Sequence, residues 1–206
     1  MISKTEQRIM EIFRKNIFKK YTIREILRIS NSNSYNQIFK AVKALQKKQI
    51  IEIEKRGNSA ICSIDMESYD AIKALADAEY TAASAARIPR QNIKEIIDTI
   101  ETPFFICMVT GSYAKQTQTK KSDLDIAMIV EDSQNTKKIL NQITNKGELL
   151  IPQAHPYIFT KTQFLQMLLE KEANYGKLAF ENHLLVNGAE NYYLIIKEAI
   201  KNGFRG

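Results

Sequence analysis

Apolar residues recur at helical spacing in three segments near the start of the chain. Residues 4–18, 23–27 and 35–48 each place apolar side chains three or four positions apart, and a Ser or Thr precedes each segment. Such a pattern predicts short amphipathic helices that begin at side-chain caps. We therefore expect three helices within the first 50 residues.

Two runs of alternating apolar and polar residues follow these helices, at residues 50–54 and 60–64. The residues between them, Lys55 to Ser59 with Gly57 and Asn58, have a turn composition, so the pattern predicts a β-hairpin with a basic tip. Three helices followed by a hairpin resemble the winged helix-turn-helix family over residues 1–65. The resemblance implies that the third helix enters the major groove of DNA and that the hairpin contacts its backbone or minor groove.

The same resemblance indicates which side chains would contact duplex DNA. The residues expected to face DNA are Ser34, Tyr35, Asn36, Gln37 and Lys40, with Lys43 and Arg56 as further phosphate partners. Asn36 and Gln37 are the candidates for reading base edges, because amide side chains pair with bases in the major groove. Winged helices also dock proteins, so a protein partner is the alternative.

Charge is distributed unevenly along the chain, whose formal net charge is +7. Residues 1–65 hold 14 Lys and Arg against 6 Asp and Glu, whereas residues 66–206 hold 16 against 17. A basic first part is suited to a polyanionic partner. Taken alone, the excess of positive charge favours a solvated lysine-rich surface, and only the helical pattern favours DNA.

Residues 66–88 are rich in alanine, with eight alanines between Ala71 and Ala86. Alanine has the highest helix propensity, so we expect a helical connector that ends before Pro89. A rigid spacer and a homodimer interface are its two expected uses.

From residue 89 onwards, apolar strand-like runs alternate with helical patterns. The expected strands are residues 104–109, 122–130, 148–151 and 157–159, and the expected helices are residues 91–100, 133–143, 161–171 and 189–201. This alternation predicts a small mixed sheet with flanking helices over residues 89–206. The whole chain is thus expected to be of the α+β class.

Polar residues that are able to bind a metal ion or a phosphate lie where the first of these strands ends and the second begins. Gly111 and Ser112 form a turn after the first strand, and Asp123 and Asp125 stand near the start of the second. Carboxylates at positions i and i+2 of a strand point to the same face. There they can share a hard cation such as Mg²⁺, which usually completes its shell with substrate phosphates.

Gly111-Ser112, ten intervening residues and Asp123-x-Asp125 closely resemble the signature of the DNA polymerase β-like nucleotidyltransferase superfamily. The resemblance covers roughly residues 90–206. It implies that Asp123 and Asp125 are catalytic and bind Mg²⁺ or Mn²⁺, and that Gly111, Ser112 and Ser122 bind a nucleoside triphosphate such as ATP.

Two positions depart from that family's pattern. Gln116 stands where relatives often have glycine, and no clear third carboxylate is present on the later strand that should carry one. Residues 149–159 offer Gln153 and His155 instead. Because histidine titrates near neutrality, His155 is a candidate catalytic base; an uninvolved histidine at a strand end is the alternative.

Two functions of different classes follow. The first is a Mg²⁺-dependent nucleotidyltransferase that moves NMP from an NTP to a hydroxyl acceptor and carries a DNA-binding winged helix. The second is a DNA-binding transcriptional regulator whose degenerate nucleotidyltransferase-like domain senses a nucleotide or dimerises. The two aspartates favour the enzyme, and the missing third acid favours the regulator.

Cellular location is indicated by features that the chain lacks. Its start has no apolar signal-peptide core, and no apolar run reaches membrane-spanning length. Cys62 and Cys107 both lie in apolar runs, where buried free thiols are expected. We expect a cytoplasmic protein with no membrane partner.

Overall fold

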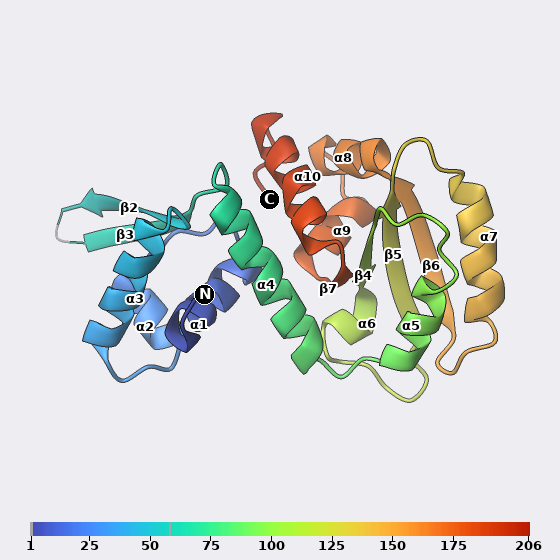
Figure 1. Ribbon diagram of the computed structural model, residues 1–206, viewed down its shortest axis with the longest axis horizontal. Coiled ribbons are helices and arrows are strands. Elements are labelled where there is room, and N and C mark those ends of the chain that lie inside the picture. Colours follow the sequence, from blue (N-terminus) through green and yellow to red (C-terminus); the bar gives the residue numbers. More distant parts are fainter. Residues whose placement is uncertain (1, 58) are drawn as a thin grey trace. The chain divides into compact units, whose positions relative to one another are not determined.

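The computed structural model describes residues 2–57 and 59–206, and the chain divides into two compact units (Figure 1). The first unit extends to Thr81, and the second runs from Ala82 to Phe204. Asn58, in the expected hairpin tip, lies outside the described residues. Both units contain helices and a sheet, so the expected mixed α+β class is confirmed.

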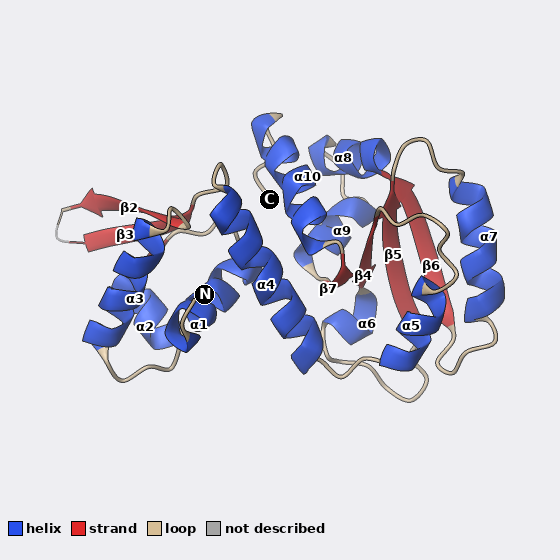
Figure 2. Cartoon of the chain, in the orientation of Figure 1, coloured by secondary structure: helices blue, strands red, loops and turns tan. Residues whose placement is uncertain are grey.

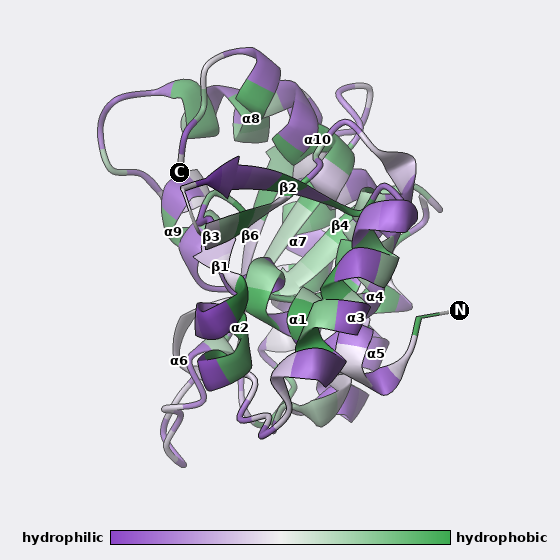
Figure 3. Cartoon of the chain, turned by 90° about the vertical axis from the view of Figure 1, so that its left-hand side faces the viewer, coloured by the Kyte–Doolittle hydropathy of each residue, from purple (hydrophilic) through white to green (hydrophobic). Residues whose placement is uncertain are grey.

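The first unit contains the three expected helices and the two expected hairpin strands (Figure 2). Its elements are α1 (Lys4–Lys15), β1 (Tyr21–Thr22), α2 (Ile23–Ile29), α3 (Tyr35–Lys47), β2 (Ile51–Arg56) and β3 (Ser59–Ile64). The two-residue strand β1 was not predicted; it joins the hairpin to give an antiparallel sheet of order β1-β3-β2. Strand β2 is largely hydrophilic (Figure 3).

Side-chain caps determine where the helices of the first unit begin. The Ser3 hydroxyl accepts a hydrogen bond from the Glu6 amide, and the Glu6 carboxylate accepts one from the Ser3 amide. Thr22 and Glu25 form the same reciprocal pair at the start of α2. Such capping boxes satisfy backbone amides that the helix itself leaves unpaired, so these helix starts can be predicted from the sequence.

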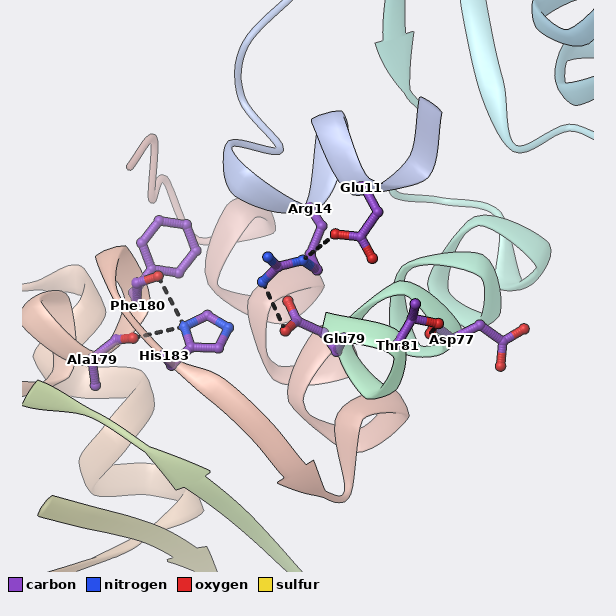
Figure 4. Close-up of polar contacts among 8 residues, drawn as sticks. All are labelled: Glu11, Arg14, Asp77, Glu79, Thr81, Ala179, Phe180 and His183. Atoms are coloured by element: carbon purple, nitrogen blue, oxygen red, sulfur yellow. Dashed lines mark hydrogen bonds and ion pairs between the residues drawn. The ribbon is translucent and has the colours of Figure 1, made fainter. Parts of the chain in front are cut away.

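Helix α4 (Tyr69–Ala85) forms where the alanine-rich segment predicts a helix, and the boundary between the units falls inside it. Glu79, in its first-unit part, is fully buried. Arg14 of α1 lies 3.2 Å from the Glu79 carboxylate and 3.3 Å from that of Glu11 (Figure 4). A buried carboxylate requires such a charged partner, so the N-terminal part of α4 is built into the first unit.

The second unit is a mixed four-stranded sheet with helices on both faces (Figure 2). Its elements after α4 are α5 (Arg90–Ile97), β4 (Phe105–Val109), α6 (Gly111–Ala114), β5 (Leu124–Val130), α7 (Thr136–Gly147), β6 (Ala154–Thr160), α8 (Lys161–Leu169), α9 (Tyr175–Glu181), β7 (Leu184–Asn187) and α10 (Ala189–Lys201). The strand order is β6-β5-β4-β7, in which only β5 and β6 are parallel.

Alternation along β5 separates the two faces of this sheet. Leu124, Ile126 and Met128 are buried in a core with Ile93 of α5 and Ile143 of α7. The intervening residues point to the opposite face, over which α8, α9 and α10 lie (Figure 2). Asp125, the charged residue of β5, therefore belongs to the face that carries the C-terminal helices.

The prediction of a strand at residues 148–151 is wrong. Helix α7 continues to Gly147, and the chain then turns before β6 begins at Ala154. A side chain on Gly147 would lie 2.9 Å from the carbonyl oxygen of Ala154, so the helix end packs tightly against the next strand. Leu149 and Ile151 are 80% and 94% exposed, so these two apolar side chains lie on the surface and not in the core.

The second histidine, His183, has a structural role at the end of α9. Its Nδ1 lies 2.7 Å from the carbonyl oxygen of Ala179 and 3.1 Å from that of Phe180 (Figure 4). Because carbonyl oxygens only accept, Nδ1 carries the proton and donates to both. The ring thereby satisfies carbonyls that the helix terminus leaves unpaired.

Both cysteines are buried free thiols, as predicted. Burial raises the pKa of the Cys62 thiol to about 11 and that of Cys107 to about 12, so neither is a reactive thiolate near neutral pH. Within the described ranges, no helix combines the length and the apolar character needed to cross a bilayer.

Candidate functional site

The two motif aspartates lie at the start of β5, on the face opposite the α5–α7 core. Asp125 is the second residue of the strand and is half-buried, while Asp123 precedes the strand and its side chain is 47% exposed. Their neighbour Leu124 is fully buried on the other face. Strand alternation thus directs both carboxylates away from the core.

The Gly-Ser turn approaches Asp125 so closely that a side chain at position 111 would displace the Asp125 carboxylate. Gly111 has a φ of +62°, and a side chain there would place its Cβ 2.1 Å from Asp125 Oδ2. The preceding residue, Thr110, donates its backbone N–H to the Asp125 carbonyl oxygen at 2.9 Å. The turn that carries half-buried Ser112 is therefore fixed directly beside the Asp125 carboxylate.

Strand pairing brings His155 to the same carboxylates. In the parallel register of β5 and β6, Asp125 is paired with His155. Paired residues of neighbouring strands share a face, and the His155 Nδ1 lies 3.9 Å from Asp123 Oδ2. His155 is thus adjacent to both aspartates, with 55% of its side chain exposed.

The electrostatics of the site concentrate on Asp125. Burial raises the pKa of the Asp125 carboxyl above its ordinary value, nearby His155 lowers it, and the carboxylate of Asp123 raises it again. Two neighbouring carboxylates, one of them partly desolvated, form a location that a cation would stabilise. The site fits Mg²⁺ or Mn²⁺ in that respect, with Asp123 and Asp125 as the residues that would hold the ion.

The set of protein ligands is incomplete by itself. In the described part of the chain, no group of three or more His, Cys, Asp or Glu side chains is arranged to hold a metal ion. Mg²⁺ is commonly held by one or two carboxylates together with substrate phosphates and water. Two aspartates therefore suit an ion that arrives with a nucleotide rather than a permanently bound one.

Gln116, which stands where nucleotidyltransferase relatives often have glycine, lies in the loop between the Gly-Ser turn and β5. Its φ is +56°, a left-handed conformation that glycine adopts most readily. The Gln116 side-chain oxygen accepts from the Arg87 amide at 2.9 Å, which helps to hold this conformation. Further along the loop, the Ser122 hydroxyl accepts from the Thr119 amide at 2.9 Å, so Ser122 shapes the approach to Asp123.

The residues expected to contact DNA fall into two groups. Ser34, Tyr35, Asn36, Gln37, Lys40, Lys43 and Arg56 are all exposed. However, the Gln37 amide donates to the Thr5 hydroxyl at 2.9 Å, and the Arg56 guanidinium binds both carboxylate oxygens of Glu54. Gln37 and Arg56 would have to exchange these partners to bind DNA. Lys43 Nζ donates to the neutral Gln46 side-chain oxygen at 3.0 Å, and the charges of Lys40 and Lys43 both stay on the surface of α3.

Sequence reasoning missed three residues that border the site, namely Thr110, Tyr157 and Tyr175. The Thr110 and Tyr175 hydroxyl oxygens lie 2.8 Å apart, and the Tyr157 and Tyr175 rings are stacked. Tyr157 could have been found from its position two residues after His155 on a predicted strand. Tyr175 could not, because no local pattern indicates that α9 returns to this strand.

A cavity lies elsewhere in the second unit. Its volume is about 560 Å³, and it is lined by residues from Phe104 to Ile106, Ile129 to Ser133 and α10. These positions are at the opposite end of β5 from Asp123 and Asp125. This cavity is therefore separate from the candidate site, which is defined by the carboxylates and the glycine turn.

Residues 91–155 match a protein-family model described as "Polymerase beta, Nucleotidyltransferase". The matched range contains Gly111, Ser112, Asp123 and Asp125 and ends at His155. Searches among curated proteins and among solved structures gave no match. The family match supports a nucleotidyltransferase domain here and nucleotidyl transfer as its general chemistry.

Replacing Asp125 with Asn should stabilise the ligand-free protein at pH 7. Folding raises the pKa of this carboxyl, so its contribution to stability is present at low pH and lost as pH rises through the raised pKa. An uncharged amide avoids that loss. Calorimetry should show a higher Tm for Asp125→Asn at pH 7 and a difference that shrinks as pH falls to about 4.

The exposed Asp77 provides the matched control for this measurement, because Asp77→Asn removes a carboxylate in a solvated position. It should leave the Tm nearly unchanged at both pH values. A lower Tm for Asp125→Asn at pH 7, or a gain that does not depend on pH, would contradict this description of Asp125.

Proposed function

We propose that the second unit is a nucleotidyltransferase that moves NMP from an NTP, such as ATP, to a hydroxyl acceptor with the help of Mg²⁺ or Mn²⁺. The observation that carries the proposal is the close approach of Gly111 to Asp125. It puts a turn with an accessible backbone directly beside a carboxylate pair, which is what binding of a metal-bound phosphate requires. The family match over residues 91–155 supports the same chemistry.

Each motif residue has a definite task in this proposal. Gly111 allows phosphate oxygens to approach the backbone, Ser112 offers a hydroxyl, and Ser122 keeps the loop before Asp123 in shape. Asp123 and Asp125 would hold the metal ion. When bound, that ion neutralises phosphate charge and orients the transferred group, which accounts for most of the catalysis in phosphoryl transfer.

His155 is the proposed general base. It occupies the strand position paired with Asp125, and in this proposal the acceptor hydroxyl that attacks the phosphate approaches from that side. A neutral imidazole can take the acceptor's proton, and the Asp123 carboxylate 3.9 Å away would stabilise the resulting cation. The histidine would thereby replace the third carboxylate in accepting the proton, although not in binding metal.

We further propose that the first unit is a winged helix that binds duplex DNA. Support comes from three helices followed by a hairpin, from exposed Lys40 and Lys43 on α3, and from the basic excess of residues 1–65. A regulator that binds nucleotide without turnover is the second candidate. The observation in its favour is that the described residues offer only two carboxylates at the metal position.

Replacing Asp123 and Asp125 together with Ala should abolish Mg²⁺-dependent nucleotide binding and transfer, because both expected metal ligands are lost. The assay incubates the protein with labelled NTPs and Mg²⁺ or Mn²⁺, with and without cell extract as a source of acceptor. Glu131→Ala is the matched control, since it removes an exposed carboxylate beyond the far end of β5. Undiminished MgATP binding by the double variant would remove these aspartates from the site.

His155→Ala should lower the transfer rate by roughly 10²- to 10⁴-fold, the usual contribution of a general base, with nucleotide affinity little changed. His155→Asp should restore part of the rate, because aspartate in this position recreates a third carboxylate beside Asp125. Single-turnover rates and equilibrium binding measure the two quantities separately. A rate for His155→Ala equal to that of the wild type would show that this histidine has no catalytic role.

Binding of the full chain to duplex DNA should weaken steeply with salt, because neutralised phosphates release counterions. Replacing Lys40 and Lys43 with Ala should reduce the slope of log affinity against log salt by about 2, or about 1 per phosphate contact. Lys137→Ala combined with Lys171→Ala, two exposed lysines of the second unit, should leave the slope unchanged. Failure to bind duplex DNA at low salt would eliminate DNA as the partner.

A further inference from the structure

Two tyrosines form a stacked pair on the face of the second sheet that carries the aspartates. The ring centroids of Tyr157, on β6, and Tyr175, at the start of α9, are 4.2 Å apart with an interplanar angle of 26°. Phe159 is tilted against Tyr175 at 5.6 Å. Tyr175 is partly buried, but Tyr157 is 38% exposed, so the pair combines a supported ring with an accessible one.

Strand register places this pair directly beside the carboxylate site. Tyr157 pairs with Ala127, two residues beyond the pairing of His155 with Asp125. Side chains two residues apart on a strand share a face at a spacing of about 7 Å. The accessible ring is thus within the length of one nucleotide from Asp125.

A second contact ties the pair to the glycine turn. The Tyr175 hydroxyl lies 2.8 Å from the Thr110 hydroxyl, and Thr110 immediately precedes Gly111. Burial raises the pKa of the Tyr175 phenol to about 12, with a smaller contribution from the Asp125 carboxylate in the same direction. The turn, the carboxylate and the ring that supports Tyr157 therefore form one connected group.

We propose that the accessible ring of Tyr157 stacks against the base of the NTP whose phosphates bind at Gly111, Asp123 and Asp125. The inference rests on the proposed function of that site and adds to it a base-binding position. Stacking uses the π-face that every base possesses, so it accepts all four bases and favours the larger purines. Tyr175 acts as a positioning residue, because it holds the ring of Tyr157 from behind.

Tyr157 differs in its exposure from the tyrosines of the core. A tyrosine that served only the core would be covered, as Tyr192 and Tyr193 of α10 are, with 1% and 2% exposure. Tyr157 instead keeps much of its surface in solvent while its ring is stacked against Tyr175. An aromatic side chain that is exposed and also fixed in orientation loses little conformational entropy when it binds a flat ligand.

The test compares binding of MgATP with binding of magnesium tripolyphosphate to the full chain, because the second ligand has phosphates but no base. Tyr157→Ala should weaken MgATP binding by about 5- to 150-fold, the range for loss of one base stack, and leave tripolyphosphate binding unchanged. It should also abolish the preference of the wild type for ATP over UTP. Tyr157→Phe, which retains the ring, should bind MgATP like the wild type.

Tyr69→Ala, at an exposed tyrosine of the first unit, is the matched control and should bind both ligands normally. If Tyr157→Ala binds MgATP like the wild type, Tyr157 does not stack on the nucleobase and the inference is wrong. If it weakens both ligands equally, Tyr157 is a structural residue and the inference is also wrong. If the wild type binds neither ligand, the proposed function itself fails, an outcome that the wild-type measurement alone identifies.

Discussion

The close approach of Gly111 to Asp125 is the constraint on which the candidate site depends. Position 111 has a φ of +62°, which strains any residue but glycine, and a Cβ there would displace the Asp125 carboxylate oxygen. The hydrogen bond from Thr110 to the Asp125 carbonyl holds the two strands at this separation. One backbone contact therefore brings the turn beside a charge that burial makes costly, and that cost is the reason a bound cation would be favoured.

Parallel pairing of β5 with β6 completes the same site from the other side. It brings His155 next to Asp125 and Tyr157 next to Ala127. One strand thus carries both the proposed general base and the ring proposed to stack on the nucleobase. The three proposed roles would thus follow one another on one face of the sheet: metal and phosphate binding at β4 and β5, proton transfer at the start of β6, and nucleobase binding two residues further along β6.

The two units differ in how directly their residues are available for binding. On α3 of the first unit, Lys40 and Lys43 are exposed, while Gln37 and Arg56 already have partners in Thr5 and Glu54. If the first unit binds DNA as proposed, attraction by the two lysine charges would break no ion pair, because the hydrogen-bond partner of Lys43 is the neutral Gln46, but base readout through Gln37 would require loss of its bond to Thr5. Under that proposal the first encounter would be governed by charge, and sequence recognition would depend on an exchange of hydrogen bonds.

The sequence by itself determined the features that depend on neighbouring residues. Capping residues such as Thr22 located helix starts, and Gly111-Ser112 with Asp123-x-Asp125 defined the candidate site, because caps, turns and strand alternation act over a few positions. Leu149 and Ile151 misled the strand prediction, because apolar composition cannot tell an exposed turn from a core strand. The pairing of Asp125 with His155 and the stacking of Tyr157 on Tyr175 were decided only by the tertiary structure, because strand register and helix packing join segments that no local pattern relates.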